Sequence, residues 1–223
     1  MSNISSHCLV CVGPTSFGID QDIMDASGCL ILPPVRRGDV EKIVQEHPPG
    51  NLAIVDGTFH SYPAVSHVEL REALRAGWHI WGLCSMGAIR AYEMRFLGMV
   101  GFGKVYEQFE IHEDFRDDEV ALVHSAEKPY MPITEPLVHI REFVRQMVGE
   151  GYLEQTAGNN IIERLAGMWY GFRTLRTLGE MTIDTWCGPG SRLDDNLREF
   201  SRFRIKSKDL ECFLETKPWL SEA

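Results

Sequence analysis

The chain has 223 residues, of which 44% are hydrophobic and 24% are charged. This composition is typical of a globular protein with a sizeable core, and it excludes disordered, fibrous and low-complexity proteins. The 22 basic and 32 acidic side chains give a formal net charge of −10. A general affinity for the phosphate backbone of nucleic acids is therefore not expected.

No targeting or membrane-spanning segment is evident. The first basic residue is Arg36, so the positive region of a secretory signal peptide is missing. The longest mostly apolar stretch, 77–89, is too short to cross a bilayer. The six cysteines are scattered along the chain, which argues against a disulfide scaffold. We expect a cytoplasmic protein with no membrane association.

Short apolar runs alternate with amphipathic segments through the first half of the chain. The segment 66–76 predicts a helix, because Ser66 is a suitable N-cap and Glu69 completes a capping box. The alternation predicts βαβ units and a parallel sheet. Strands are expected at 8–12, 29–32, 52–55 and 78–81, and further helices at 38–45 and 86–96.

The second half is mostly helical in pattern. Gly98, Gly101 and Gly103 predict a loop, and 119–123 predicts one more strand. Helices are expected at 135–148, 160–168 and through 193–214. The predicted fold is α/β, a single domain over residues 1–223. It has a parallel-sheet core with a Rossmann-like amino-terminal half, about 1–125, and a mostly helical carboxy-terminal half, 126–223.

Two charged segments stand out. Residues 107–119 carry seven acidic side chains and one arginine, and residues 192–208 are rich in basic side chains. Such runs are most often solvated faces. The alternative is that they are docking surfaces for protein partners, whose binding would then depend on salt.

The most informative local motif is Gly82-Leu83-Cys84-Ser85-Met86-Gly87, between an expected strand and an expected helix. This context exposes a side chain at the carboxyl end of a sheet, and the Met86 N–H could stabilise an oxyanion there. The match to G-x-S-x-G fails at Leu83, and the match to G-x-C-x-G fails at Met86. Ser85 as a nucleophile, Cys84 as a nucleophile and a purely structural turn all remain open.

A serine nucleophile needs a base. A lysine can serve when burial or nearby positive charge favours its neutral form. Histidine is the commoner choice, but none stands in a triad signature, and the residues alone do not decide between the two types. The available histidines include His60, His67, His79 and His124.

Other motifs are near misses. The Walker A spacing over 98–105 ends in Val105 and follows a helix, which argues against a phosphate loop. His67-Val68-Glu69 is half of a zinc-deaminase signature without its cysteines. Cys8 and Cys11 lie in one strand and point to opposite faces, so a shared metal is not expected. Neither a metal nor another cofactor is predicted.

Several segments, in order and spacing, resemble the TfuA-like family over nearly the whole chain. The P-P-x-x-R-G-D and S-M-G-A segments are together the most specific. The matching segments are Val12-Gly13-Pro14-Thr15, Leu32-Pro33-Pro34-Val35-Arg36-Arg37-Gly38-Asp39-Val40, Val55-Asp56-Gly57-Thr58-Phe59, His67-Val68-Glu69-Leu70, Cys84-Ser85-Met86-Gly87-Ala88-Ile89-Arg90-Ala91, Gly98-Met99-Val100-Gly101, Asp118-Glu119-Val120-Ala121, Glu135-Pro136-Leu137-Val138 with Ile140-Arg141, and Arg173-Thr174.

The resemblance implies a function. Proteins of this family accompany YcaO enzymes, which activate a backbone amide with ATP so that sulfur replaces its oxygen. The family member is expected to release sulfide by hydrolysing a thiocarboxylated ubiquitin-like sulfur carrier protein, and to help the YcaO enzyme bind its precursor peptide. The resemblance implies a hydrolase-like site with a Ser–Lys pair, and the mechanism expected of such a pair requires no metal.

The resemblance also implies site residues. The S-M-G-A serine is Ser85, and Lys206 takes the lysine position in a late segment that keeps Asp209 but departs from the family pattern at three other positions. The oxyanion and pocket residues are expected to be Met86, a donor within Gly13–Thr15, and Asp56, which follows a strand of the predicted sheet. Supporting residues are expected at Arg37, Asp39, His67, Arg90, Arg173 and Asp209.

Two other functions remain open at this point. The chain could be a non-catalytic adaptor that docks a YcaO enzyme with its peptide, since the segment around Lys206 departs from the family pattern. It could also be an unrelated serine hydrolase acting on a small ester or amide without any partner.

Overall fold

The computed structural model describes residues 7–59, 62–112 and 115–221. Contacts divide the chain into two compact units, each described here by itself. The first, called the sheet unit, comprises Met1–Phe115 and Lys206–Ala223. The second, called the helical unit, is Arg116–Ile205. The single domain expected from the sequence remains a prediction.

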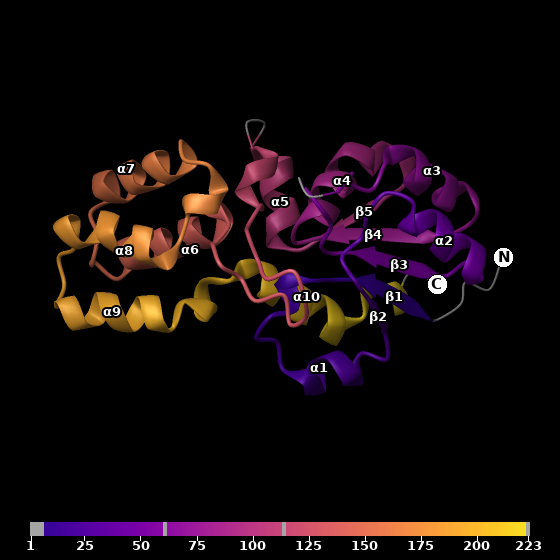
Figure 1. Ribbon diagram of the computed structural model, residues 1–223, viewed down its shortest axis with the longest axis horizontal. Coiled ribbons are helices and arrows are strands. Elements are labelled where there is room, and N and C mark those ends of the chain that lie inside the picture. Colours follow the sequence, from indigo (N-terminus) through magenta and orange to yellow (C-terminus); the bar gives the residue numbers. More distant parts are fainter. Residues whose placement is uncertain (1–6, 60–61, 113–114, 222–223) are drawn as a thin grey trace. The chain divides into compact units, whose positions relative to one another are not determined.

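The sheet unit is built on a parallel sheet (Figure 1). Among the described residues it has five strands in the order β2-β1-β3-β4-β5, and every neighbouring pair is parallel. The predicted α/β class is therefore confirmed. In doubly wound sheets of this order, ligands bind beside the carboxyl ends of β1 and β3, where the order reverses. The strands are β1 (Cys8–Cys11), β2 (Leu30–Leu32), β3 (Asn51–Ile54), β4 (His79–Leu83) and β5 (Val100–Phe102).

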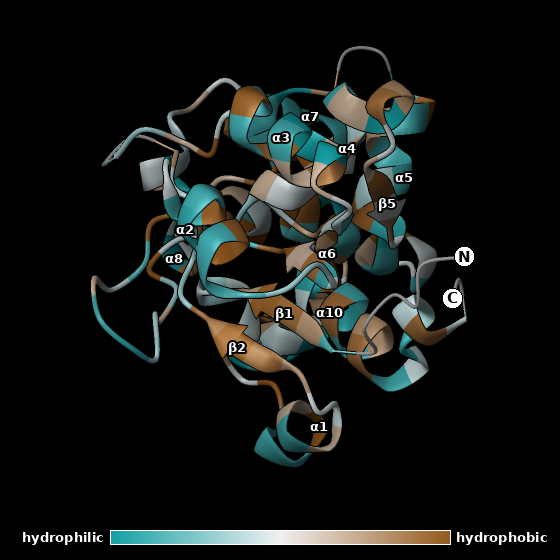
Figure 2. Cartoon of the chain, turned by 90° about the vertical axis from the view of Figure 1, so that its right-hand side faces the viewer, coloured by the Kyte–Doolittle hydropathy of each residue, from teal (hydrophilic) through white to brown (hydrophobic). Residues whose placement is uncertain are grey.

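Alternating side chains of the strands face two helical layers. On one face Val10, Ala53 and Trp81 form an apolar core with Leu210 and other residues of α10. On the other face α4 packs so closely that Gly87 lies against the carbonyl of Ile54. Strands β1 and β2 are mostly hydrophobic in Figure 2, as is typical of a sheet covered on both faces. The helices of the unit are α1 (Gln21–Ala26), α2 (Asp39–Glu46), α3 (His67–Arg75), α4 (Met86–Met94), α5 (Lys104–Ile111) and α10 (Ile205–Thr216).

Of two local predictions in this unit, the structure confirms one and contradicts the other. Helix α3 begins with the predicted capping box of Ser66 and Glu69. The loop expected over 98–103 is wrong, since it contains the short edge strand β5. The sequence did not predict this strand because Gly101, at its centre, has no side chain to contribute to an apolar pattern. Glycine is needed there because the ring of Tyr106 occupies the place of a Cβ.

The helical unit has its own apolar core, in which Phe143 contacts the rings of Phe200 and Phe203. The strand predicted at 119–123 is wrong: residues 117–119 form a 3-10 turn. Glu119 there is buried and forms a bidentate ion pair with Arg141, and Val120 and Ala121 are buried after it, so the apolar run reflects inward packing and not strand pairing. The helices are α6 (Leu137–Gly149), α7 (Gln155–Ala166), α8 (Leu175–Thr182) and α9 (Gly190–Arg198).

The helix expected through 193–214 is divided. Helix α9 ends at Arg198, a 3-10 turn spans Phe200–Phe203, and α10 begins at Ile205. The division separates α9, which belongs to the helical unit, from α10, which belongs to the sheet unit. In the part of the chain that the structure describes, no helix is both long and apolar enough to cross a membrane.

Candidate active site

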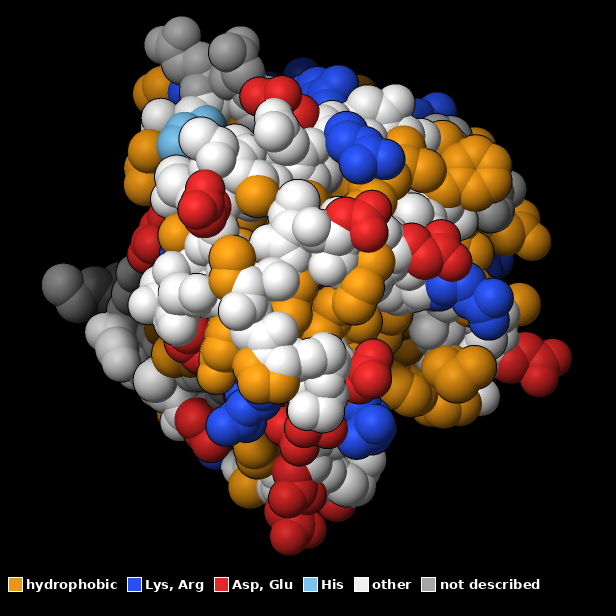
Figure 3. All heavy atoms as spheres, turned by 90° about the vertical axis from the view of Figure 1, so that its left-hand side faces the viewer, with side chains coloured by type: hydrophobic (Ala, Val, Ile, Leu, Met, Phe, Trp, Pro, Cys, Tyr) orange, Lys and Arg blue, Asp and Glu red, His pale blue; other side chains and the backbone are white. Residues whose placement is uncertain are grey.

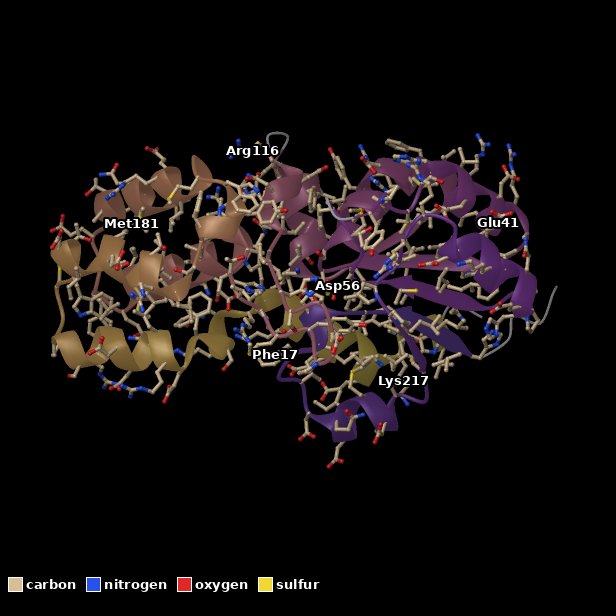
Figure 4. The ribbon with its side chains drawn as sticks, in the orientation of Figure 1. Phe17, Glu41, Asp56, Arg116, Met181 and Lys217 are labelled. Carbon is tan, nitrogen blue, oxygen red and sulfur yellow. The ribbon has the colours of Figure 1, made fainter. Side chains whose placement is uncertain are left out.

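The candidate site lies at the carboxyl edge of the sheet, where the segments after β1, β3 and β4 meet. Gly13, Asp56 and Ser85 each stand two residues beyond the last residue of their strand. Parallel strands end at the same edge, so these residues are brought together although they are far apart in sequence. Helix α10 adds Lys206 from its first turn. Figure 4 shows Asp56 beyond the end of β3 and near α10.

The central contact joins Lys206 to Ser85. The Lys206 Nζ donates a hydrogen bond to the Ser85 Oγ over 3.2 Å. Both residues are buried, with 1% of Lys206 and 3% of Ser85 exposed. The structure therefore places the two residues of the predicted pair within the reach that proton transfer requires.

The turn that presents Ser85 is strained. Cys84 has φ +63°, in the left-handed region that residues with a side chain seldom occupy. Ser85 follows as the N-cap of α4, and its N–H donates to the Leu83 carbonyl over 2.7 Å. Gly87 is required next, because a Cβ there would lie 1.6 Å from the Ile54 carbonyl oxygen. Strain held in place by close packing is a common feature of functional turns.

Cys84 occupies the sharp bend but is unsuited to nucleophilic attack. It is fully buried, and its Sγ donates to the Lys206 carbonyl oxygen over 3.2 Å. Burial, followed by the charges of Asp209 and Asp56, raises the pKa of this thiol well above its ordinary value. The geometry thus favours Ser85 over Cys84, a choice that the residues alone had left open.

Asp56 is held by the loop after β1. Its carboxylate accepts hydrogen bonds from the Gly13 N–H and the Thr15 N–H, both over 2.9 Å, and from the Thr15 hydroxyl over 2.7 Å. The expectation that an amide of Gly13–Thr15 holds an oxyanion therefore fails, because Asp56 already takes these donors. The Asp56 Oδ1 lies 3.9 Å from the Lys206 Nζ. This loop thus fixes a carboxylate beside the amine.

Met86 remains the donor suited to an oxyanion. It is the first residue of α4, and a helix leaves its first amides without intrahelical acceptors. The positive end of the helix dipole lies at the same place, so a developing negative charge beside Ser85 would be stabilised.

Arg204 and Lys208 are the cationic residues nearest to Lys206 in the sequence. Arg204 forms an ion pair with the buried Glu135 in the helical unit, and Lys208 is exposed. That their positive charge favours a neutral Lys206 remains a prediction from the sequence. Burial disfavours the charged amine, and the Asp56 carboxylate favours it.

Asp209 anchors the helix that carries Lys206. Its carboxylate accepts hydrogen bonds from the Lys104 N–H and the Val105 N–H at the start of α5, over 3.0 and 2.9 Å. Burial raises the pKa of Asp209 to about 6, against these two hydrogen bonds, which lower it. Asp209 thus fixes the start of α10 relative to α5.

The other expected supporting residues make contacts away from Ser85. Arg90 donates to the Val65 carbonyl and pairs with Glu93, which also pairs with His67. Arg37 donates to the Ala64 carbonyl, and Asp39 accepts from the Arg36 N–H. These contacts organise the loop before α3 and the start of α2.

Arg173 lies in the helical unit. It is completely buried, and its guanidinium donates to the carbonyl oxygens of Leu165, Met168 and Asp118 and to the Asp118 carboxylate. These bonds hold the segment after residue 116 against the end of α7. Its role within that unit is structural.

One contact at the site was not anticipated. Ser207 donates its hydroxyl to the Thr15 carbonyl oxygen over 2.9 Å. Ser207 therefore joins α10 directly to the loop that holds Asp56, the residue beside Lys206. A serine on an amphipathic helix gives no sequence signal for such a contact. Among the described residues, no group of three or more His, Cys, Asp or Glu side chains is placed to hold a metal ion.

Comparison with models of known protein families assigns the chain to a family. A model of the TfuA-like protein family matches residues 56–174, more than half of the chain. The chain belongs to the TfuA-like family. Membership supports a role in the YcaO-associated thioamidation system. No curated protein matches the chain.

The matched region of this TfuA-like chain covers only part of the candidate site. It includes Asp56 and Ser85, and it ends before Lys206 and Asp209. Gly13 and Thr15 lie before it. The assignment of Lys206 therefore depends on the contact with Ser85 more than on the family match.

Proposed function

We propose that this TfuA-like chain hydrolyses the thiocarboxylate of a ubiquitin-like sulfur carrier protein and thereby supplies sulfide to a YcaO enzyme. The observation that carries the proposal is the 3.2 Å hydrogen bond between the Lys206 Nζ and the Ser85 Oγ in a buried site. A serine becomes nucleophilic when a positioned base takes its proton, and a desolvated lysine can be that base.

The reaction would proceed in two steps. The Ser85 Oγ attacks the thiocarboxylate carbon while Lys206 takes the hydroxyl proton, and the Met86 N–H stabilises the oxyanion. The carbon–sulfur bond then breaks, sulfur leaves with the electron pair, and the Lys206 ammonium returns a proton to give hydrosulfide. Water next attacks the Ser85 ester with Lys206 again as the base. This second step releases the carrier carboxylate and restores the serine.

Asp56 would position the amine between these steps. Its carboxylate is fixed by three hydrogen bonds from the loop after β1 and lies 3.9 Å from the Lys206 Nζ. A fixed negative charge at this distance stabilises the ammonium that forms when Ser85 loses its proton. The loop of Gly13 and Thr15 thus acts through Asp56.

The test is sulfide release from a thiocarboxylated carrier by the Ser85→Ala variant. We expect release to fall by about a thousandfold or more, because the nucleophile is lost. Ser191→Ala, at an exposed position of α9 in the helical unit, is the matched control and should retain full activity. Undiminished release by a folded Ser85→Ala protein would refute the mechanism.

One observation favours a second function, that of an adaptor docking the YcaO enzyme with its precursor peptide. Ser85 and Lys206 expose only 3% and 1% of their surfaces, which leaves a carrier terminus little direct access. Added sulfide separates the two functions. It should restore thioamidation to the Ser85→Ala protein if the chain is the sulfide source. Full thioamidation by Lys206→Met with the natural sulfur donor would instead favour the adaptor.

A further inference from the structure

A pair of cysteines lies at the edge of the sheet opposite to Ser85. Cys8 is the first residue of β1, and Cys29 directly precedes β2. Because the register pairs Leu9 with Leu30, Cys8 and Cys29 are neighbours across the two strands. Both belong to the apolar layer beneath α10, so they share one face of the sheet.

The two side chains are close enough to react with one another. Each thiol is a cause of the pKa shift of the other, as is expected of neighbouring sulfur atoms. Neighbouring strands are about 4.8 Å apart, and a disulfide requires Cα atoms roughly 4.4–6.8 Å apart. Both cysteines are free thiols in the structure.

The surroundings distinguish Cys29 from Cys8. Cys29 is half-buried, whereas Cys8 is buried. The Ser27 side chain lies beside Cys29, since its Oγ accepts a hydrogen bond from the Cys29 N–H over 3.1 Å. The amine of Lys217, which donates to the Ala26 carbonyl over 2.8 Å, adds a positive charge. Both favour the thiolate form of Cys29.

The thiol pKa values follow this asymmetry. The neighbouring Cys8 thiol, then those surroundings, lower the pKa of Cys29 to about 7, although burial opposes the shift. The Cys29 thiol and burial raise the pKa of Cys8. The buried Cys11 differs from Cys29, since burial raises its pKa to about 12. A partly exposed thiolate beside a second thiol is the arrangement that thiol–disulfide exchange requires.

We propose that Cys29 and Cys8 form a thiol–disulfide exchange site for small-molecule disulfides, separate from the site at Ser85. The Cys29 thiolate attacks one sulfur of the disulfide, which forms a mixed disulfide and releases one thiolate. The Cys8 thiol then loses its proton and attacks the Cys29 sulfur, which releases the second thiolate. The chain is oxidised by two electrons to a Cys8–Cys29 disulfide, and the small disulfide is reduced to two thiols.

The site is tested with the aromatic disulfide dithiobis(nitrobenzoate) on the full chain. Cys187 and Cys212, which are exposed, are first replaced by serine to remove their reaction. We expect two equivalents of aromatic thiol per chain, no retained adduct, and a Cys8–Cys29 disulfide in the peptide map. In that background Cys8→Ser should release one equivalent and retain the adduct on Cys29. Cys29→Ser should react at least about tenfold more slowly.

Two results would overturn the proposal. One is an adduct that persists on Cys29 while Cys8 is present, which would show that Cys8 does not resolve it. The other is an unchanged rate in the Cys29→Ser protein. Circular dichroism of each variant checks that the fold is retained.

The pH dependence of alkylation measures the ionisation of Cys29 directly, without requiring Cys8 to react. The rate of reaction of Cys29 with iodoacetamide should reach half its maximum near pH 7. Cys8→Ala, which removes the neighbouring thiol, should move this midpoint toward that of an ordinary thiol, about pH 8.5. Cys8→Ser keeps a donor and should stay nearer to pH 7. A midpoint that is the same in Cys8→Ala and in the parent would contradict the role given to Cys8.

Discussion

Asp56 shows how one residue organises the site from three directions. Two backbone amides and one hydroxyl donate to its carboxylate, and the Lys206 amine lies 3.9 Å away. Only the ionised carboxylate accepts all of these bonds without a donor of its own. The sequence predicted Asp56 in this crevice, but it assigned the amides of Gly13–Thr15 to an oxyanion instead.

Asp56→Asn should therefore destabilise the chain and slow sulfide release. The amide group brings its own N–H toward the donors of Gly13 and Thr15, so at least one buried donor loses its partner. A cost of about 1–3 kcal/mol in the free energy of unfolding is expected. Urea unfolding measures it, and Thr15→Val, which removes only the hydroxyl, should cost less. A larger loss for Thr15→Val would argue against the central place of Asp56.

At the scale of elements, the approach of α4 to the strands depends on glycine. A Cβ at Gly87 would lie 1.6 Å from the Ile54 carbonyl oxygen, and one at Gly82 would lie 2.2 Å from the Gly87 carbonyl oxygen. Backbone atoms cannot give way as a flexible side chain can. The two glycines of the G-L-C-S-M-G motif therefore serve close packing beside the turn that presents Ser85.

Gly87→Ala should destabilise the sheet unit by several kcal/mol, since α4 must move away from β3. Thermal unfolding measures the effect, and loss of sulfide release should accompany it. Gly149→Ala is the control: it lies at the end of α6 with nothing near its Cβ position, and it should be neutral or stabilising by about 0.5 kcal/mol. Equal effects of the two changes would contradict the packing argument.

The junction of α10 with α5 should depend on pH through Asp209. Its pKa is raised from 3.8 to about 6 by burial. Between these values the folded chain binds more protons at this site than the unfolded chain does. The free energy of unfolding should therefore fall as the pH rises through this window, by on the order of 2 kcal/mol, and be insensitive to this group above it.

The measurement is the difference between the parent and Asp209→Asn in urea unfolding from pH 4 to pH 7. Asparagine does not titrate, so the contribution of this residue to the pH profile should disappear. Other carboxylates cancel in the difference. Parallel profiles for the two proteins would show that Asp209 titrates alike in the folded and unfolded states.

At the scale of the whole molecule, each unit has a core of its own. The core with Phe213 contains residues of the sheet unit, and the core with Phe143 contains residues of the helical unit. Phe213→Ala should therefore lower hydrogen-exchange protection mainly in the sheet unit, and Phe143→Ala mainly in the helical unit. Each should cost about 3–5 kcal/mol. Equal loss in both units would indicate the single cooperative domain that the sequence predicts.

Several charged side chains of the acidic and basic stretches form ion pairs within the chain. In the acidic stretch 107–119, Asp118 and Glu119 pair with Arg173 and Arg141. In the basic stretch 192–208, Arg198 pairs with Asp195 and Arg204 with Glu135, as part of the helical unit. On the face shown in Figure 3, basic and acidic side chains are interspersed and no single basic patch is visible. Fewer charges of these two stretches are therefore available to bind a protein partner than the sequence suggests.

The sequence by itself determined the α/β class, most strand positions, the capping box of α3 and the prominence of Ser85. These follow from periodicity and from turn chemistry, which act over a few residues. The sequence-based prediction was wrong at β5, where a glycine hides the apolar pattern of a strand. It was also wrong at 119–123, where an apolar run is buried without forming a strand. The sequence also shows six cysteines but not which of them are neighbours.

Only the tertiary structure decided how distant residues meet. Ser85 and Lys206 are 121 positions apart, and they meet because α10 packs within the sheet unit. Local patterns do not record such a contact, because it depends on where a strand ends and on which face a later helix covers. The register of β1 and β2 decided the Cys8–Cys29 pair in the same way.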